Sequence, residues 1–142
     1  MFCTIKKFTL LPFIEKKMLI ESLFVSLYVK ILLLLFSFNF IEKKIIKKKT
    51  EKIKNLNSKE TILLIKKSIQ RSSHLIFWKN LCLEQSLTAL IMLRKRKIPY
   101  TLYFGIRKNN SKLQAHVWIS SESIYVIEKG NEEFTILKEY SG

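Results

Sequence analysis

A chain of 142 residues is long enough for one domain with a modest core. Its hydrophobic fraction of 48% excludes a wholly disordered protein, and its two cysteines exclude a disulfide scaffold or a cysteine-rich zinc site. All 11 acidic residues are glutamate, which excludes metal loops built on aspartate and any triad that needs an aspartate.

The net charge of +15 suggests a nucleic-acid partner at first sight. The kind of cation argues against that partner, because arginine, which contacts phosphates and bases in bidentate fashion, is scarce. It occurs only at Arg71, Arg94, Arg96 and Arg107. The other cations are lysines mixed with isoleucine, leucine and phenylalanine, and residues 1–59 carry +9 against +6 for residues 60–142. We therefore expect no nucleic-acid partner.

Residues 18–41 form the most hydrophobic segment. Nothing in residues 1–17 has the cleavage site of a signal peptide, which predicts a cytoplasmic protein. The segment is long enough to cross a bilayer, but its apolar gain and the cost of its polar residues, Lys30 above all, sum to about zero on insertion scales. On a helix its polar residues form one narrow stripe: Ser22, Ser26, Lys30 and Ser37.

Three interpretations of this helix stay open: burial against the domain, peripheral contact with a membrane, and a true span. For peripheral contact, Lys16, Lys17 and the cluster 43–49 are the expected contacts with anionic lipid. Residues 42–59 are a lysine-dense connector, helical or frayed. Residues 1–59 are thus predicted to be a hydrophobic helix with its connector, ahead of a core domain at residues 60–142.

In the core domain, helical periodicity comes first. Asn57 and Glu60 form a weak capping pattern for a helix that runs through Arg71. After a turn near residues 72–74, a second helix is predicted from about residues 80–82 to Lys97, ahead of Pro99.

Alternation of period two then predicts strands around 102–106, 115–119 and 124–127, with 134–137 as a candidate fourth strand. The short connections favour an antiparallel meander. Two helices followed by antiparallel strands indicate an α+β fold.

Cys82 and His116 carry the most distinctive chemistry. Cys82 falls in the first turn of the second predicted helix, where unpaired N–H groups and the helix dipole favour a nucleophilic thiolate and can hold an oxyanion. His116 points to the face of its strand opposite the apolar row. Cysteine hydrolases pair a cysteine at a helix start with such a histidine. Taken alone, the two residues are a weak signal, and a buried small side chain with a satisfied sheet residue is the more common arrangement.

Four short blocks around these residues follow one another in a fixed order: CLEQSLTAL (82–90), LRKRKIP (93–99), LYFGIR (102–107) and LQAHVWI (113–119). Together they resemble the lasso peptide biosynthesis B proteins, transglutaminase-like cysteine proteases that remove the leader from a lasso precursor. That family has Cys-Leu with a serine four residues on, Leu-Arg-Arg-x-Gly-Ile, a Gly-Val or Gly-Ile strand, and Ala-His-Ala-Trp-Val. The resemblance covers about residues 60–130; Lys97 stands where the family usually has glycine.

The resemblance implies a papain/transglutaminase-like core, with the catalytic cysteine at a helix N-terminus packed on a small antiparallel sheet. It implies Cys82 as nucleophile and His116 as base. No leader-recognition domain fits ahead of residue 60, so the split form is expected. Its partners are the lasso precursor peptide, a separate leader-recognition protein and an ATP-dependent lasso cyclase. The chain itself is expected to bind no metal and no cofactor, although the overall reaction is expected to depend on ATP.

The third catalytic residue is the least secure position. The family has an aspartate about a dozen residues after the histidine, and this chain has Glu128 there, with Glu122 as a second candidate. A catalytically weak or inactive protein that binds peptide or membrane stays open as an alternative. Gln85 is placed in the oxyanion environment, in competition with a helix-capping role. Trp118 either walls the active site or packs under the N-terminal helix.

Overall fold

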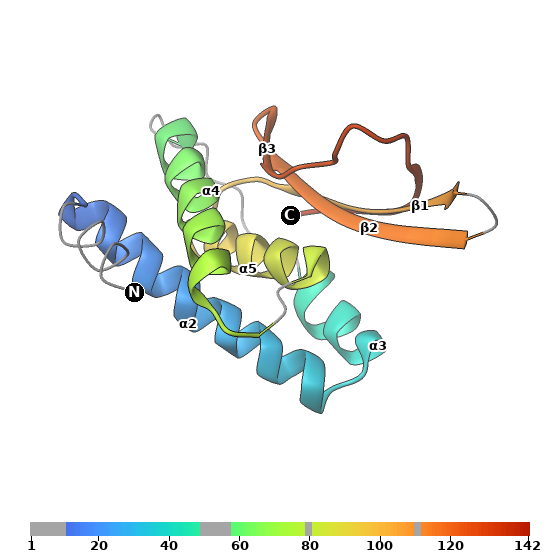
Figure 1. Cartoon of the computed structure of the whole chain (residues 1–142), viewed down its shortest axis with the longest axis horizontal. Helices are drawn as coiled ribbons and strands as arrows, with labels where there is room; N and C mark the ends of the chain where they lie inside the picture. The colour runs from blue at the N-terminus through green and yellow to red at the C-terminus, as the bar shows by residue number, and fades with distance from the viewer. Residues whose placement is uncertain (1–10, 49–57, 79–80, 110–111) are drawn as a thin grey trace.

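The computed structural model describes residues 11–48, 58–78, 81–109 and 112–142. Helices cover one face of a four-stranded sheet (Figure 1), so the predicted α+β fold is confirmed. The helical elements are α2 (Phe13–Leu35), α3 (Phe38–Ile41), the π-helical turn η1 (Glu42–Ile46), α4 (Ser58–Leu75) and α5 (Cys82–Lys95). The strands are β1 (Thr101–Asn109), β2 (Lys112–Ser121), β3 (Ile124–Ile127) and β4 (Thr135–Ser141).

The helices α4 and α5 correspond to the two predicted core helices, but α4 continues to Leu75, so the predicted turn at residues 72–74 was wrong. Helix α4 buries Ile62, Ile65 and Ile69 along one face, as the periodicity requires. Helix α5 ends where Lys97 adopts a left-handed backbone conformation, with φ of 56°. Glycine adopts that conformation without strain, so the glycine that the lasso peptide biosynthesis B proteins usually have at this position would suit it.

The sheet has the strand order β3–β2–β1–β4, with all neighbours antiparallel. The predicted meander holds for the first three strands. The fourth strand does not extend the meander beyond β3 but returns to pair with β1. Residues 128–134 make this return across the face of the sheet that the helices leave uncovered (Figure 1).

The two faces of the sheet bury different kinds of side chain. Leu102, Val117 and Ile119 belong to the main core, together with buried residues of the helices. On the opposite face, Trp118 stacks on Tyr103, with ring centroids 5.4 Å apart. Alternation along β2 therefore sends His116 to the face with Trp118, as the sequence predicts.

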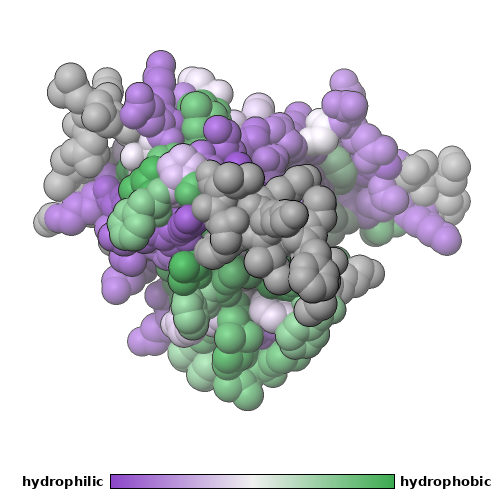
Figure 2. Space-filling model, turned by 60° about the vertical axis from the view of Figure 1, so that its left-hand side comes forward, coloured by the Kyte–Doolittle hydropathy of each residue, from purple (hydrophilic) through white to green (hydrophobic). Residues whose placement is uncertain are grey.

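Helix α2 packs against α4 and α5 with Ser22, Ser26 and Lys30 of the predicted stripe directed inward. The prediction was wrong for Ser37, which is exposed and lies in the break between α2 and α3. Ser22 is fully buried and its hydroxyl lies within hydrogen-bonding distance of the carbonyls of Leu19 and Ser68, at 2.8 and 3.2 Å. Ser26 is buried as well. Among the described residues, α2 is the one helix long and apolar enough to cross a bilayer by length and composition. Its apolar side faces outward, and Figure 2 shows apolar side chains gathered at that end of the molecule.

The first part of the predicted connector is structured. Turn η1 buries Glu42, which accepts hydrogen bonds from Tyr140 and Lys138 of β4, and Arg94 of α5 donates to the carbonyl of Ile45 at 2.6 Å. Residues 49–57 of that connector lie outside the described residues. The division of the chain at residue 59 stays a prediction about its domain organisation.

Candidate functional site

Cys82 is the first residue of α5, the position that the sequence predicts for it. Its side chain is half-buried and packs against the core cluster. The preceding residue, Leu81, has an extended backbone and accepts the first helical hydrogen bond, from the N–H of Gln85 at 3.0 Å. The thiol therefore lies beside the unpaired N–H groups of a helix N-terminus, where negative charge is stabilised.

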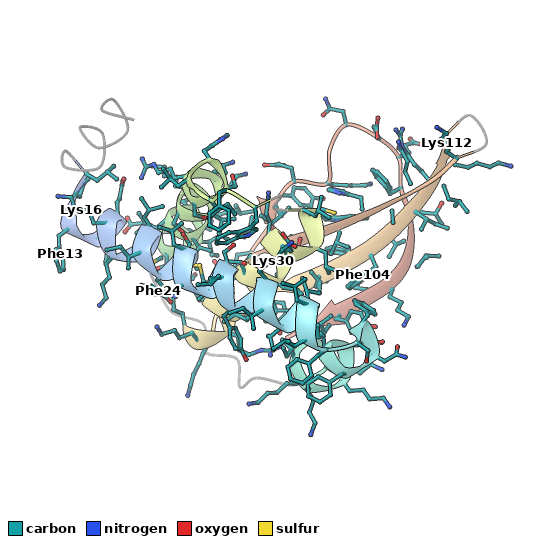
Figure 3. The ribbon with its side chains drawn as sticks, turned by 60° about the horizontal axis from the view of Figure 1, so that its bottom comes forward. Phe13, Lys16, Phe24, Lys30, Phe104 and Lys112 are labelled. Carbon is teal, nitrogen blue, oxygen red and sulfur yellow. The ribbon has the colours of Figure 1, made fainter. Side chains whose placement is uncertain are left out.

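Glu84 fixes this helix start. Its carboxylate accepts a hydrogen bond from the backbone N–H of Leu81 at 3.1 Å, which caps the helix. The same carboxylate pairs with Lys30 of α2, whose Nζ lies 2.7 Å from Oε1 (Figure 3). The Glu84 side chain is only 6% exposed, so Lys30 compensates a buried charge two residues from Cys82.

This role of Lys30 is one that sequence reasoning missed. In the sequence, Lys30 counts only as a cost of membrane insertion and as part of a polar stripe. The available signal was the coincidence of one lysine in an apolar helix with one glutamate in the first turn of the cysteine helix. Because the two are 54 positions apart, nothing in the local pattern pairs them.

The second turn of α5 is bound to the sheet. The buried hydroxyl of Ser86, four residues after Cys82, donates to the backbone carbonyl of Val117 at 3.1 Å. Strand β3 pairs with β2 only from Ile119 onward, so the edge of β2 at Val117 is free to accept this bond. We call this stretch of β2, residues 116–118, the open edge. Cys82 and Ser86 lie one turn apart on one face of α5.

His116 reaches the open edge from the other side of the sheet. Its ring packs on Trp118 and Phe134, with centroid separations of 5.8 and 5.3 Å. Nε2 lies 2.9 Å from the backbone carbonyl oxygen of Glu128, the first residue after β3. Because a carbonyl can only accept, Nε2 carries the proton, and Nδ1 is the basic nitrogen of the neutral ring.

Glu128 therefore meets His116 through a different atom from the one expected. Its carboxylate turns away from the ring to pair with Lys66 of α4, and that side chain is 61% exposed. The lysine attracts the carboxylate, while the backbone at the end of β3 already lies next to the imidazole. Orientation of the ring by the carbonyl replaces the predicted orientation by the carboxylate.

The second candidate, Glu122, lies at the turn between β2 and β3, six residues from His116. Six residues of strand span about 20 Å, which is too far to orient the ring. The carboxylate of Glu122 instead accepts a hydrogen bond from the hydroxyl of Ser58 at 2.6 Å.

Gln85 and Trp118 both lie in the elements of the site. Gln85 is a half-buried residue of the first turn of α5, and its place in the oxyanion environment stays a prediction. Trp118 contacts the His116 ring on the sheet face away from the helices, rather than packing under α2. It thus forms one wall behind the imidazole.

Cys82 begins a helix on the covered side of the sheet, whereas His116 points to the uncovered side, and no hydrogen bond joins them in the described part of the chain. Catalytic hydrogen bonds of this kind are often long in the absence of substrate. Within the described ranges, no three His, Cys or Glu side chains group in a way that could hold a metal ion. The arrangement offers a thiol at a helix N-terminus, an oriented imidazole and free N–H groups, which are the parts of a cysteine nucleophile site.

Comparison with known proteins supports the same reading. The family model of the transglutaminase-like superfamily matches residues 25–139. The match begins within α2, so it includes Lys30 as well as Cys82 and His116. No curated protein and no solved structure matches the chain. The superfamily includes cysteine peptidases. The chain belongs to the transglutaminase-like superfamily.

Proposed function

We propose that this protein is a cysteine endopeptidase that removes the leader peptide from a ribosomally made lasso precursor. The observation that carries the proposal is that Cys82 begins α5 and that Ser86, one turn later, is hydrogen-bonded to Val117, the neighbour of His116 in β2. Membership of the superfamily supports a cysteine hydrolase. The four sequence blocks that resemble the lasso peptide biosynthesis B proteins support the substrate.

In the proposed reaction, Nδ1 of His116 takes the proton from the Cys82 thiol. The thiolate attacks the carbonyl carbon of the scissile peptide bond, and backbone N–H groups at the start of α5 stabilise the oxyanion. The imidazolium then gives its proton to the leaving amine as the carbon–nitrogen bond breaks. Water, deprotonated by the same imidazole, hydrolyses the thioester and restores the thiol.

The proposal includes partners that the resemblance implies. A separate leader-recognition protein would present the precursor, and an ATP-dependent lasso cyclase would use the released core peptide. The chain would act on a peptide bond placed beside Cys82 at the start of α5.

The test is cleavage of a lasso precursor peptide by the protein mixed with a leader-recognition protein, followed by mass spectrometry. Wild type releases the leader, whereas Cys82→Ala and His116→Ala release none while keeping the wild-type circular dichroism spectrum. A Cys3→Ala variant is the matched control and cleaves at the wild-type rate. Cleavage by Cys82→Ala would remove the nucleophile assignment.

A second function is favoured by one observation: no hydrogen bond joins Cys82 and His116 in the part of the chain the structure describes. On this alternative the protein is a non-catalytic relative that binds peptide. Alkylation by iodoacetamide near neutral pH separates the two. In a peptidase, iodoacetamide modifies Cys82 faster than Cys3, and His116→Ala lowers the rate of modification at Cys82. In a non-catalytic relative, His116→Ala leaves that rate unchanged.

A further inference from the structure

The outward side of α2 and its continuation into α3 form one apolar surface, which we call the apolar face. Its members are exposed hydrophobic residues: Ile20, Phe24, Leu27, Tyr28, Ile31, Leu34, Leu35, Phe36, Phe38 and Phe40. At 100° per residue, the seven members on α2 fall within about 120° of one another. Leu34 is 73% exposed and Phe24 is 68% exposed. The face is continuous and large for a protein that meets only water.

Helix α2 is amphipathic in the reverse sense. A helix on the surface of a globular domain normally buries its apolar side and exposes its polar side. Here Ser22, Ser26 and Lys30 face the protein, while Phe24 points away from it (Figure 3). Ser22 bonds to α4 and Lys30 pairs with α5, and the outward side carries no charged side chain from residue 20 to residue 35. An uncharged, apolar outer surface of this kind is suited to contact with an apolar medium.

Charge at the two ends of the apolar face identifies the medium. Lys17 lies one turn before Ile20, and Lys43, Lys44 and Lys48 follow α3; all four are exposed and pair with no carboxylate in the described ranges. Figure 3 shows nitrogen-tipped side chains extending outward around the α3 end.

The nearby carboxylates are already neutralised by cations of the protein itself. Glu15 pairs with Arg71, Glu21 with Arg96, and Glu42 with Lys138. The surface therefore presents unpaired positive charge at both ends of an apolar strip. This combination complements anionic lipid.

The contacts of α2 decide its orientation in such a membrane. The Lys30–Glu84 pair and the bond from Ser22 to Ser68 hold the helix along its length against α4 and α5. A span would break both contacts and strip α2 from the core. A helix that keeps them lies along the surface, with about 22 Å between Ile20 and Leu35 parallel to the membrane plane.

We propose that the apolar face docks this protein onto the surface of an anionic lipid bilayer, with α2 and α3 inserted into the interface and α2 parallel to it. The sheet, on the opposite side of the molecule (Figure 1), then faces the aqueous phase. This docking goes beyond the proposed peptidase function and does not depend on it.

The test is flotation of the full chain with two kinds of vesicle. Vesicles of phosphatidylcholine with phosphatidylglycerol should carry the protein to the top of the gradient, and vesicles of phosphatidylcholine alone should carry far less. Binding should weaken as sodium chloride rises, because salt screens the lysines. Phe24→Glu with Leu34→Glu should lower the bound fraction about tenfold.

The matched control is Leu113→Glu with Leu137→Glu. These leucines are 74% and 59% exposed, close to the values for Phe24 and Leu34, but belong to β2 and β4 of the sheet. The control should float like wild type. Because all four positions are exposed, each variant should keep the wild-type circular dichroism spectrum, which confirms that it folds.

Three results would overturn the proposal. The first is failure of the wild-type protein to float with either kind of vesicle. The second is equal flotation of wild type and the α2 variant, which would assign the binding to another surface. The third is a wild-type protein that does not bind vesicles but forms a dimer in solution, measured by light scattering, which the α2 variant abolishes. A second copy would then cover the apolar face.

Discussion

The ion pair between Lys30 and Glu84 gives the sharpest prediction about stability. Replacing Lys30 with methionine keeps the length and apolar character of the side chain but leaves the buried Glu84 carboxylate without its cation. Breaking a buried pair on one side costs about 3–5 kcal/mol. Lys30 is 27% exposed, which reduces the loss. The N–H of Leu81 and the helix N-terminus still stabilise the carboxylate.

We therefore expect Lys30→Met to lower the free energy of unfolding by about 2 kcal/mol. With a urea m value of about 2 kcal/mol per M, the unfolding midpoint falls by about 1 M. The double variant Lys30→Met, Glu84→Gln has no buried charge and should recover most of that loss. The four proteins of this cycle, compared by urea unfolding, should give a coupling energy of about 1–3 kcal/mol.

The same substitution should also change the reactivity of the Cys82 thiol. The uncompensated Glu84 carboxylate lies two residues from Cys82 and disfavours a second negative charge there. Lys30→Met should therefore slow alkylation of Cys82 near neutral pH, and the double variant should restore the rate. Unchanged stability in Lys30→Met, together with a coupling energy near zero, would refute the assignment of this pair.

Four further outcomes follow from the structure. The hydrogen bond from Tyr140 holds the pKa of Glu42 at about 2, below the ordinary 4.5. The ionised Glu42 carboxylate therefore contributes fully to the free energy of unfolding above pH 4.5, and this contribution is lost as the pH falls toward about 2. Glu42→Gln should remove this part of the acid dependence of urea unfolding. Lys97→Gly should raise the free energy of unfolding by about 1 kcal/mol, because it relieves a left-handed φ. Gly105→Ala should cost about 1–3 kcal/mol and shift near-ultraviolet circular dichroism, since the new Cβ would lie 2.7 Å from the Trp118 ring. Glu128→Gln should leave precursor cleavage nearly unchanged, because the carbonyl rather than the carboxylate contacts His116.

Local pattern predicted the core elements well. The periodicity of Ile62, Ile65 and Ile69 located α4, and the alternation around Val117 and Ile119 located β2 and its buried face. Those signals depend on neighbours in the sequence, so they can be read without the tertiary structure. The place of Cys82 at the start of α5 follows from the same kind of signal.

What the sequence did not predict depends on contacts between distant residues. The return of β4 to β1 depends on which strand edge is long enough to accept it, and β3 has only four residues. The partner of His116 is a backbone carbonyl, which every residue has, so no residue type could signal it. The inward direction of the polar stripe on α2 likewise depends on Ser68 and Glu84, which belong to α4 and α5.

The return of β4 to β1 also has a kinetic consequence. Strands β1, β2 and β3 join through short connections, so they can pair soon after they are synthesised. The pairing of β1 with β4, such as Leu102 with Tyr140, can form only after the whole intervening segment has been synthesised. Pairings between such distant positions form late in folding, because a large loop must close first. Phe134, which packs on His116, arrives with that closing step. In a newly synthesised chain, the His116 ring would therefore lack its Phe134 neighbour until the last strand docks.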